Sequence, residues 1–125
     1  MKASMSGLVL IFVLILAASG CASRGTAHIE SIASAELGIK IAKDSNATIN
    51  APLELKFAED KLSAARAAAT REDFVTAKRL ADEALVDAKL AESKSITIKA
   101  KKQAQEMRDA IDTLRKEIDR TQMQK

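Results

Sequence analysis

The chain has few of the residues that make turns, strands or stacking surfaces. Among its 125 residues there are four glycines, one proline, and no tryptophan or tyrosine, and aromatic residues make up 2%. Strands favour β-branched and aromatic residues and hairpins need turn residues, so this composition disfavours an architecture built from β-hairpins. Alanine, lysine and leucine are the commonest residues instead, which is typical of long helices packed through alanine.

The sequence also lacks a dominant charge and the residue sets that most catalytic sites need. It has 20 basic and 17 acidic residues, a net charge of +3 at pH 7, and a single histidine, His28. Nucleic-acid-binding surfaces concentrate cations and add aromatic rings, so we expect no nucleic acid as a partner. One histidine cannot form a metal pair or a triad, and no glycine-rich phosphate loop is present. We expect no catalysis, no cofactor and no metal site.

A single long apolar run, Leu8 to Leu16, precedes the only cysteine, Cys21. Its nine residues are too few for a membrane-spanning helix, which needs about 20, but they fit the hydrophobic region of a signal peptide, which has about 7–15. Small residues follow the run up to the cysteine. This pattern predicts an export signal over residues 1–20, cleaved between Gly20 and Cys21. An ordinary secretory signal and an uncleaved short anchor are the alternatives.

The four residues Ala18-Ser19-Gly20-Cys21 resemble the bacterial lipobox, with alanine at the position where leucine is preferred. The resemblance implies that the Cys21 sulfur carries S-diacylglycerol and that the new amino group carries an N-acyl chain such as palmitate. Each buried methylene contributes about 0.8 kcal/mol, so two or three chains attach a protein durably to a membrane. Ala22 follows the cysteine in place of an aspartate, which by the same resemblance favours the outer membrane. We expect a periplasm-facing lipoprotein whose only non-protein component is the lipid on Cys21.

The remaining chain is predicted to be all-α, as a lipidated tether at 21–27 followed by one helical domain at 28–125. Apolar spacing and end signals predict helices at about 28–45, 52–69 and 71–121. Pro52 suits the first turn of the second helix, and Thr70 is expected to cap the third. Residues 44–50 have no apolar period and are predicted to be a connection. The expected architecture is an antiparallel helical hairpin with a preceding amphipathic helix and a long C-terminal coiled-coil-like helix.

The apolar spacing also predicts which faces are buried. For the first helix the predicted face is Ile29, Ala33, Leu37 and Ile41, with Ile32 beside it, and Gly38 weakens this helix by about 1 kcal/mol. For the second helix it is Leu55, Ala58, Leu62, Ala65 and Ala69. For the third it is Ala77, Ala81, Ala84, Ala88 and Ala91, flanked by Leu80, Leu85 and Leu90. Two alanine-lined helices joined by a short connection are predicted to pack as an antiparallel hairpin.

The third helix changes phase along its length. After a weak patch at 93–98 its apolar pattern resumes as a seam over residues 100–121: Ala100, Ala104, Met107, Ile111, Leu114, Ile118 and Thr121. Such a change resembles a stutter between coiled-coil segments. A helix over 71–121 would be about 75 Å long and would extend past the hairpin. The exposed seam is expected to pack on the first helix, on a second copy of the chain, or on another protein.

Two features suggest an envelope tether as an alternative function. Lys99, Lys101, Lys102 and Arg108 form a basic cluster that could contact peptidoglycan or anionic lipid, although a solvated face explains it more simply. Lys125 resembles the terminal lysine that links the major murein lipoprotein to peptidoglycan, but the residues before it differ. A small-ligand or lipid carrier is a further alternative, and it needs a pocket for which alanine packing leaves little room.

Four segments of the helical region are characteristic: Ala51-Pro52-Leu53-Glu54-Leu55, Ala58-Glu59-Asp60-Lys61-Leu62, Asp73-Phe74, and Ala77-Lys78-Arg79-Leu80-Ala81-Asp82-Glu83-Ala84. Together they resemble a family of bacterial lipoproteins with a helical hairpin, called domain of unknown function 4398, over roughly Ile29 to Lys102. In some relatives a peptidoglycan-binding domain follows the hairpin, and we expect none after the coiled coil here. The family implies no activity and no active-site residues. The expected function is therefore a structural or protein-interaction role at the outer membrane.

Overall fold

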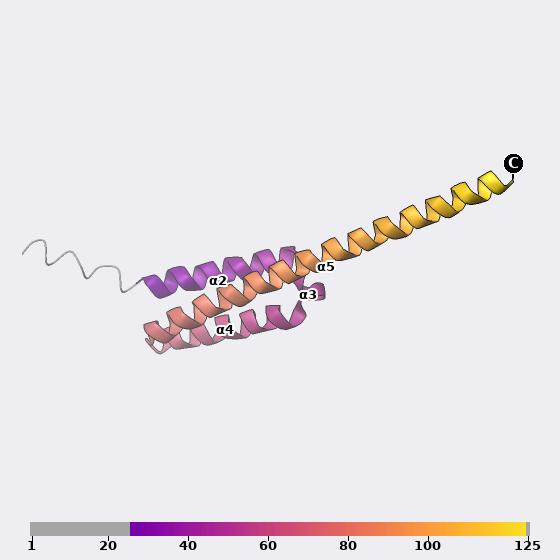
Figure 1. Cartoon of the computed structure of the whole chain (residues 1–125). Helices are drawn as coiled ribbons and strands as arrows, with labels where there is room; N and C mark the ends of the chain where they lie inside the picture. The colour runs from indigo at the N-terminus through magenta and orange to yellow at the C-terminus, as the bar shows by residue number, and fades with distance from the viewer. Residues whose placement is uncertain (1–25, 125) are drawn as a thin grey trace, which may run out of the picture.

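The computed structural model describes residues 26–124, and within this range it contains helices and no strand. The helices are α2 (Ala27–Asp44), α3 (Ala47–Asn50), α4 (Pro52–Thr70) and α5 (Phe74–Met123). The all-α prediction is confirmed. Figure 1 shows α2, α4 and the first half of α5 side by side in a bundle, while the second half of α5 continues alone to the C-terminal end.

Ion pairs between helices give the directions of the three long helices. Arg66 of α4 lies 2.7 Å from Glu36 of α2, and Lys43 of α2 lies 2.6 Å from Glu59, so α2 and α4 are antiparallel. Lys94 of α5 lies 2.5 Å from Glu54, which is in the first turn of α4. Because the chain turns from the last residue of α4 into α5, this contact means that α4 and α5 are antiparallel. The predicted α4–α5 hairpin is confirmed, and α2 completes a three-helix bundle by running parallel to α5.

The core of the bundle is made mostly of alanine. All five predicted alanines of α5 are fully buried: Ala77, Ala81, Ala84, Ala88 and Ala91. On α4 the predicted Leu55, Ala58, Leu62 and Ala65 are also buried. The fifth buried residue of α4 is Ala68, however, and not the predicted Ala69. One residue is a rotation of about 100° on a helix, which turns Ala69 away from the core just before α4 ends.

The predicted buried face of α2 is wrong. Ile29, Leu37 and Ile41 are 58%, 59% and 40% exposed, and Ala33 is exposed as well. The buried residues of α2 are Ala35, Gly38, Ile39 and Ala42, with Ile32 partly buried against the core. The alanine stripe of α5 admits a neighbour only at short distance, because interhelical spacing follows the size of the side chains between the axes. The face of α2 with three small residues therefore packs inward, and Ile39 is the one large residue buried with them.

Gly38 marks the closest approach of α2 to α5. A β-carbon built there would lie 2.7 Å from Leu85 Cδ1 and 3.4 Å from the Ala88 β-carbon. The first distance is too short for carbon atoms in contact, so a side chain at position 38 would displace Leu85. The glycine that the sequence marks only as a weak point of the helix is a packing residue.

The connection between α2 and α4 contains more structure than predicted. Asn46 has a left-handed backbone (φ 66°), which asparagine tolerates better than most residues, and this residue ends α2. The single turn α3 follows and buries Ala47, while Ile49 stays 79% exposed. Residues 44–50 are thus a connection, as expected, but one that contributes an alanine to the core.

The turn from α4 into α5 differs from the predicted Thr70 cap. The Thr70 hydroxyl donates back to the Arg66 carbonyl inside α4. Asp73 is the residue that caps α5, because its carboxylate accepts from the Thr76 N–H at 3.1 Å. The third helix consequently begins at Phe74 and not at residue 71, and it ends at Met123 and not at residue 121.

Helix α5 is continuous through residues 93–98, where the sequence shows its weakest apolar pattern. Ser95 continues the alanine stripe and is fully buried. From Ile96 to Gln124 every described residue is exposed. We call α5 after Ser95 the extension. The predicted projection of the third helix past the hairpin is confirmed.

Candidate functional site: the outer face of α5

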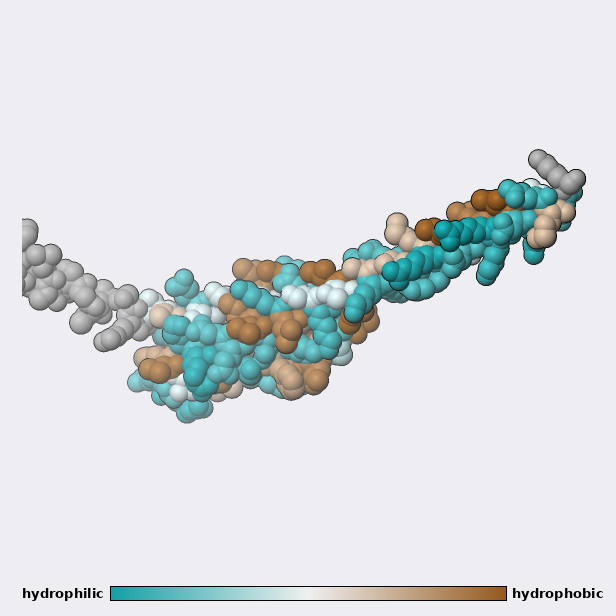
Figure 2. Space-filling model, in the orientation of Figure 1, coloured by the Kyte–Doolittle hydropathy of each residue, from teal (hydrophilic) through white to brown (hydrophobic). Residues whose placement is uncertain are grey.

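The extension carries a row of large apolar side chains in solvent. Met107, Ile111, Leu114 and Ile118 are 70%, 50%, 63% and 56% exposed. Figure 2 shows apolar side chains along one edge of the extension, between hydrophilic ones. Between Lys99 and Gln122 these four are the only large apolar residues, and steps of four and three residues place them on one stripe. An exposed apolar stripe of this kind marks a surface that binds another helix or another protein.

The stripe continues toward the N-terminal end of α5, into the bundle. Steps of four and three residues lead back from Met107 without a break, and we call this whole stripe the outer seam. Its members are Val86, Leu90, Ser93, Thr97, Ala100, Ala104, Met107, Ile111, Leu114 and Ile118. Val86 and Leu90 are 65% and 54% exposed although they lie in the bundle. The prediction that Leu90 flanks the buried stripe is therefore wrong, since its side chain belongs to the outer seam.

The outer seam and the buried alanine stripe lie on opposite sides of α5. Both stripes follow a heptad repeat, and where they overlap each residue of the outer seam lies two residues after one of the alanine stripe. Two residues of a heptad separate the stripes by roughly 150° around the helix axis. What the sequence presents as a phase change between two segments is thus two overlapping seams on one straight helix. The buried alanine stripe of α5, which we call the inner seam, contacts α2 and α4, and the outer seam faces solvent.

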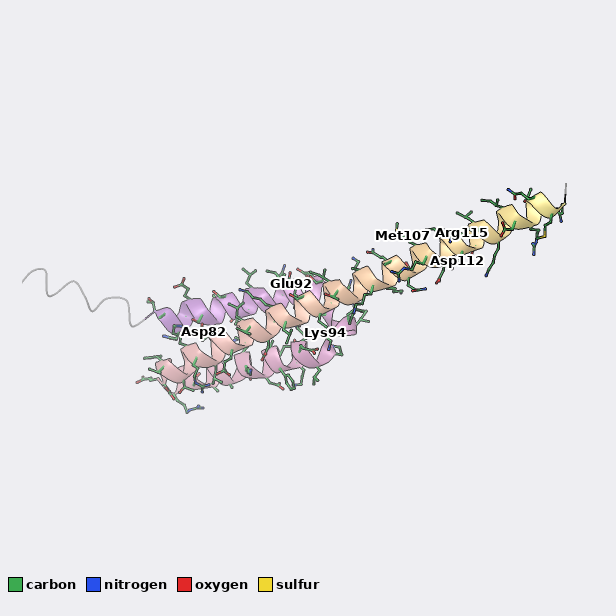
Figure 3. The ribbon with its side chains drawn as sticks, viewed as in Figure 1. Asp82, Glu92, Lys94, Met107, Asp112 and Arg115 are labelled. Atoms are coloured by element: carbon green, nitrogen blue, oxygen red, sulfur yellow. The ribbon has the colours of Figure 1, made fainter. Side chains whose placement is uncertain are left out.

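A row of cations borders the outer seam on the side of α4. Lys94, Lys101, Arg108 and Arg115 follow each other at intervals of seven residues. Lys94 belongs to the bundle and pairs with Glu54, and this contact holds the pKa of the Glu54 carboxyl below its ordinary value. Arg115 lies 3.9 Å from Asp112 on its own helix. Figure 3 shows Asp112 and Arg115 on the extension near Met107.

A small polar cluster fixes the place where α5 leaves the bundle. The Ser95 hydroxyl donates to the Ser45 carbonyl at 2.5 Å and accepts from the Asn50 side-chain amide at 3.1 Å. Ser45 follows α2 and Asn50 ends α3, so this one buried hydroxyl joins both ends of the connection to α5. The cluster determines where the bundle ends and the extension begins.

At the other end of the bundle, His28 and Phe74 bring the beginnings of α2 and α5 together. Their rings stack with centroids 4.4 Å apart and an interplanar angle of 22°. His28 Nδ1 is buried and has no hydrogen-bond partner among the described residues. The His28 ring thus covers part of Phe74, the residue that starts α5. The start of α2 therefore lies at the end of the bundle from which α5 points away.

The grooves on the bundle are shallow and lined by ion pairs. One groove of about 520 Å³ lies between Val75 and Val86 of α5 and Lys61 of α4. Lys61 lies 2.7 Å from Asp87 there, and this pair raises the pKa of the lysine. Over residues 26–124 no group of histidine, cysteine and carboxylate side chains could hold a metal ion, and none of the described helices could span a membrane.

Comparison with protein families gives one match. A family model described as a domain of unknown function, DUF4398, matches residues 30–107, more than half of the chain. The chain belongs to the DUF4398 family. No curated protein and no solved structure matches it. The matched range covers most of the bundle and the first part of the extension, and it ends before Ile111, Leu114 and Ile118 of the outer seam.

In this DUF4398 protein, several residues predicted to be functional lie outside the described range. Gly20 and Cys21, the predicted cleavage and lipidation positions, precede residue 26, and Lys125 follows residue 124. The basic cluster Lys99, Lys101, Lys102 and Arg108 lies on the extension, and all four side chains are exposed.

Two features of the DUF4398 chain were missed in the sequence. The ion pairs between helices were not predicted, because a linear pattern shows pairs within a helix but not across helices. Of the cation row at Lys94, Lys101, Arg108 and Arg115, only Lys101 and Arg108 belong to the predicted basic cluster. Its seven-residue spacing is visible in the sequence, and a helical projection centred on the outer seam would have found it.

Proposed function

We propose that this protein is an exported lipoprotein with a structural or protein-interaction role and no catalytic activity. In this proposal, cleavage after Gly20 leaves Cys21 as the lipidated N-terminus, which attaches the protein to the periplasmic face of the outer membrane. The observation that carries the interaction role is the extension, a helix with an apolar seam whose described residues are all exposed. The resemblance of Ala18-Ser19-Gly20-Cys21 to the lipobox supports the proposed lipid anchor.

The fold supports this arrangement through the positions of its ends. The stacked rings of His28 and Phe74 place the start of α2 at the end of the bundle opposite the extension. The extension, residues 96–123, adds about 40 Å of helix beyond the bundle. A lipid at Cys21 would thus attach one end of the molecule to the membrane, and the outer seam would be presented at the other end.

The anchor is tested by metabolic labelling with palmitate. The wild-type chain is expected to incorporate label and to fractionate with membranes, and Cys21→Ser is expected to lose both properties. Ser23→Ala, two residues away, serves as the matched control and is expected to keep them. Label that persists on Cys21→Ser would overturn lipid attachment at this cysteine.

The interaction role is tested by placing a photo-activated cross-linking residue on α5 in living cells. At Met107, on the outer seam, the probe is expected to form a protein adduct. At Lys116, which lies roughly 150° around the same helix, it is expected to form none. If neither position forms an adduct, the extension has no protein partner and the interaction role fails.

A second candidate function is an envelope tether that contacts peptidoglycan. Its support is that α5 carries Lys99, Lys101, Lys102 and Arg108 away from the predicted lipid, into the space where the cell wall would lie. Charge reversal at Lys99 and Lys102 should then reduce co-sedimentation with purified peptidoglycan, whereas reversal at Lys56, in the bundle, should not. Mass analysis after murein digestion, with and without Lys125, tests a covalent link.

A further inference from the structure

We propose that the outer seam is the interface of a parallel, in-register, two-stranded coiled coil between two copies of this chain. The inference rests on the proposed function, because it names the partner of the same surface. It uses three properties of α5: the order of residue shapes along the seam, the charges beside it, and the position of the other helices.

The order of side chains along the seam is the one that favours two parallel strands. The steps of three and four residues define a heptad in which Ile111 and Ile118 take the first apolar position and Met107 and Leu114 take the second. β-branched residues at the first position and leucine at the second favour parallel dimers over trimers or tetramers. Nearer the bundle the seam narrows to Thr97, Ala100 and Ala104, which permits a close approach of the two helices.

The flanking charges oppose an antiparallel pair. The position after the second apolar residue holds Lys101, Arg108 and Arg115. In an antiparallel coiled coil this row would face the same row of the other copy, cation against cation, and like charges disfavour that pairing.

In a parallel pair the same cations face a different row. The position before the first apolar residue holds Gln103, Ala110 and Glu117. With the copies in register, Gln103 would lie beside Arg108 of the partner subunit, and Ala110 beside Arg115 of the partner subunit. No like charges meet across residues 101–122. The charge pattern thus selects the parallel orientation.

The bundle leaves room for a second copy. The inner seam, with Ala84, Ala88 and Ala91, holds α2 and α4 on the side of α5 opposite the outer seam. Val86 and Leu90 remain more than half exposed beside them, so the bundle does not cover this side of α5. Two copies anchored by lipids in one membrane would also point the same way, as the parallel orientation requires.

The test uses the full exported chain in cells and single cysteines on α5. In a parallel pair in register, two copies of residue 114 lie opposite each other, within the separation of about 7 Å between α-carbons that a disulfide allows. Leu114→Cys is therefore expected to give a disulfide-linked dimer under mild oxidation. The controls are Lys116→Cys, on the opposite side of the helix, and the wild-type chain. The yield of disulfide-linked dimer from each is expected to be lower by roughly tenfold or more.

A second set of variants tests the seam without a cysteine. Ile111→Asp and Leu114→Asp place a charge in the interface and are expected to convert the detergent-solubilised dimer to a monomer in sedimentation. Lys116→Asp is the matched charge control and is expected to remain a dimer. Because the extension makes no contact with the bundle, the cooperative thermal unfolding of the bundle should persist in all three, which separates loss of pairing from loss of folding.

The outcomes separate this inference from the proposed function. Dimer formation by Leu114→Cys alone supports it. A monomeric wild-type chain, or equal cross-linking of Leu114→Cys and Lys116→Cys, overturns it. If Met107 then forms a photo-adduct with a different protein, the interaction role stands and the homodimer is rejected. If Cys21→Ser keeps the palmitate label while the wild-type chain is a dimer, the anchor at Cys21 fails and the inference stands.

Discussion

Glu72 occupies a backbone conformation that usually belongs to glycine. Its φ is 61°, and it stands at the position that closes α4: the Asp73 N–H donates to the Ala68 carbonyl at 3.0 Å and the Glu72 N–H to the Ala69 carbonyl at 2.9 Å. This pair of bonds is the Schellman arrangement, which favours glycine at the left-handed residue. A side chain in that conformation costs roughly 1–2 kcal/mol.

Replacing this residue by glycine should therefore stabilise the bundle. We expect Glu72→Gly to raise the free energy of unfolding by about 1 kcal/mol, because the relieved strain exceeds the added freedom of the unfolded chain. Denaturant unfolding measures the change. Arg71→Gly is the matched control, since Arg71 has a φ of −88° and glycine there is expected to destabilise. Equal effects at positions 71 and 72 would contradict the role of the left-handed conformation.

Ser95 is the one polar residue of the buried stripe on α5, and its hydroxyl both donates and accepts a hydrogen bond. Ser95→Ala would leave the Ser45 carbonyl and the Asn50 amide without this partner, in a place where α3 covers them. We expect a loss of about 1–3 kcal/mol in the free energy of unfolding. Ser63→Ala, on the exposed face of α4, provides the comparison and should change stability little. A Ser95→Ala variant as stable as the wild type would show that water replaces these bonds.

At the scale of the elements, an ion pair between helices, the cap of α5 and an ion pair within α5 make stability depend on pH. Contact with Lys94 holds the pKa of Glu54 below its ordinary value, contact with the Thr76 N–H does so for Asp73, and contact with Lys78 does so for Asp82. A carboxyl whose pKa is lower in the folded state contributes stability above its unfolded pKa, about 4, and loses it as the pH falls through the folded value.

We therefore expect the thermal midpoint of the bundle to be constant from pH 7 to about 5 and to fall steeply below about 4. Glu54→Gln should lower the midpoint at neutral pH and flatten the fall in acid, because the amide cannot gain a proton. Glu106→Gln, on the extension outside the bundle, should keep the wild-type curve. Parallel curves for Glu54→Gln and the wild type would show that the pair with Lys94 contributes nothing.

The elements also show how far sequence reasoning reaches. The alanine stripe of α5 was predicted in full, because a regular spacing over five residues has one helical solution. The face of α2 was predicted wrongly, because the spacing of Ile29, Leu37 and Ile41 is as regular as that of a buried face. The partner decides between the faces: a neighbour lined with alanine accepts the face that carries Ala35, Gly38 and Ala42. Ile39 is the one large side chain of α2 that is buried with them.

The outer seam was predicted only in part, for a related reason. The sequence presents residues 93–98 as a weak patch, because the two seams overlap there and their positions hold hydroxyl residues: Ser93 and Thr97 of the outer seam and Ser95 of the buried stripe. Once Ser95 is seen to be buried, Ser93 and Thr97 fall on the opposite side and the outer seam becomes continuous. The predicted lipidation position has the reverse character: Cys21 is predicted from the sequence alone and lies outside the described residues.

At the scale of the whole molecule, one helix belongs to two environments. Residues 77–95 of α5 are held by α2 and α4, whereas residues 100–123 are all exposed, and their side chains hydrogen-bond and ion-pair within the extension itself, as Arg115 does with Asp112. Isolated helices of this length are marginal in water, since nucleation is unfavourable and little tertiary packing supports them. The extension is therefore expected to open locally while the bundle stays folded.

Hydrogen exchange of the soluble fragment 26–125 measures this difference and relates it to pairing. At low protein concentration, backbone amides of residues 100–123 should exchange roughly a hundredfold or more faster than those of residues 77–95, because they open without unfolding the bundle. If two copies pair through the outer seam, protection in the extension should rise with concentration, whereas protection in the bundle should change little. Leu114→Asp should abolish that rise. Protection of the extension equal to that of the bundle at every concentration would mean that α5 unfolds as one unit, and α5 would then be a single rigid rod and not a bundle helix with a separate interaction segment.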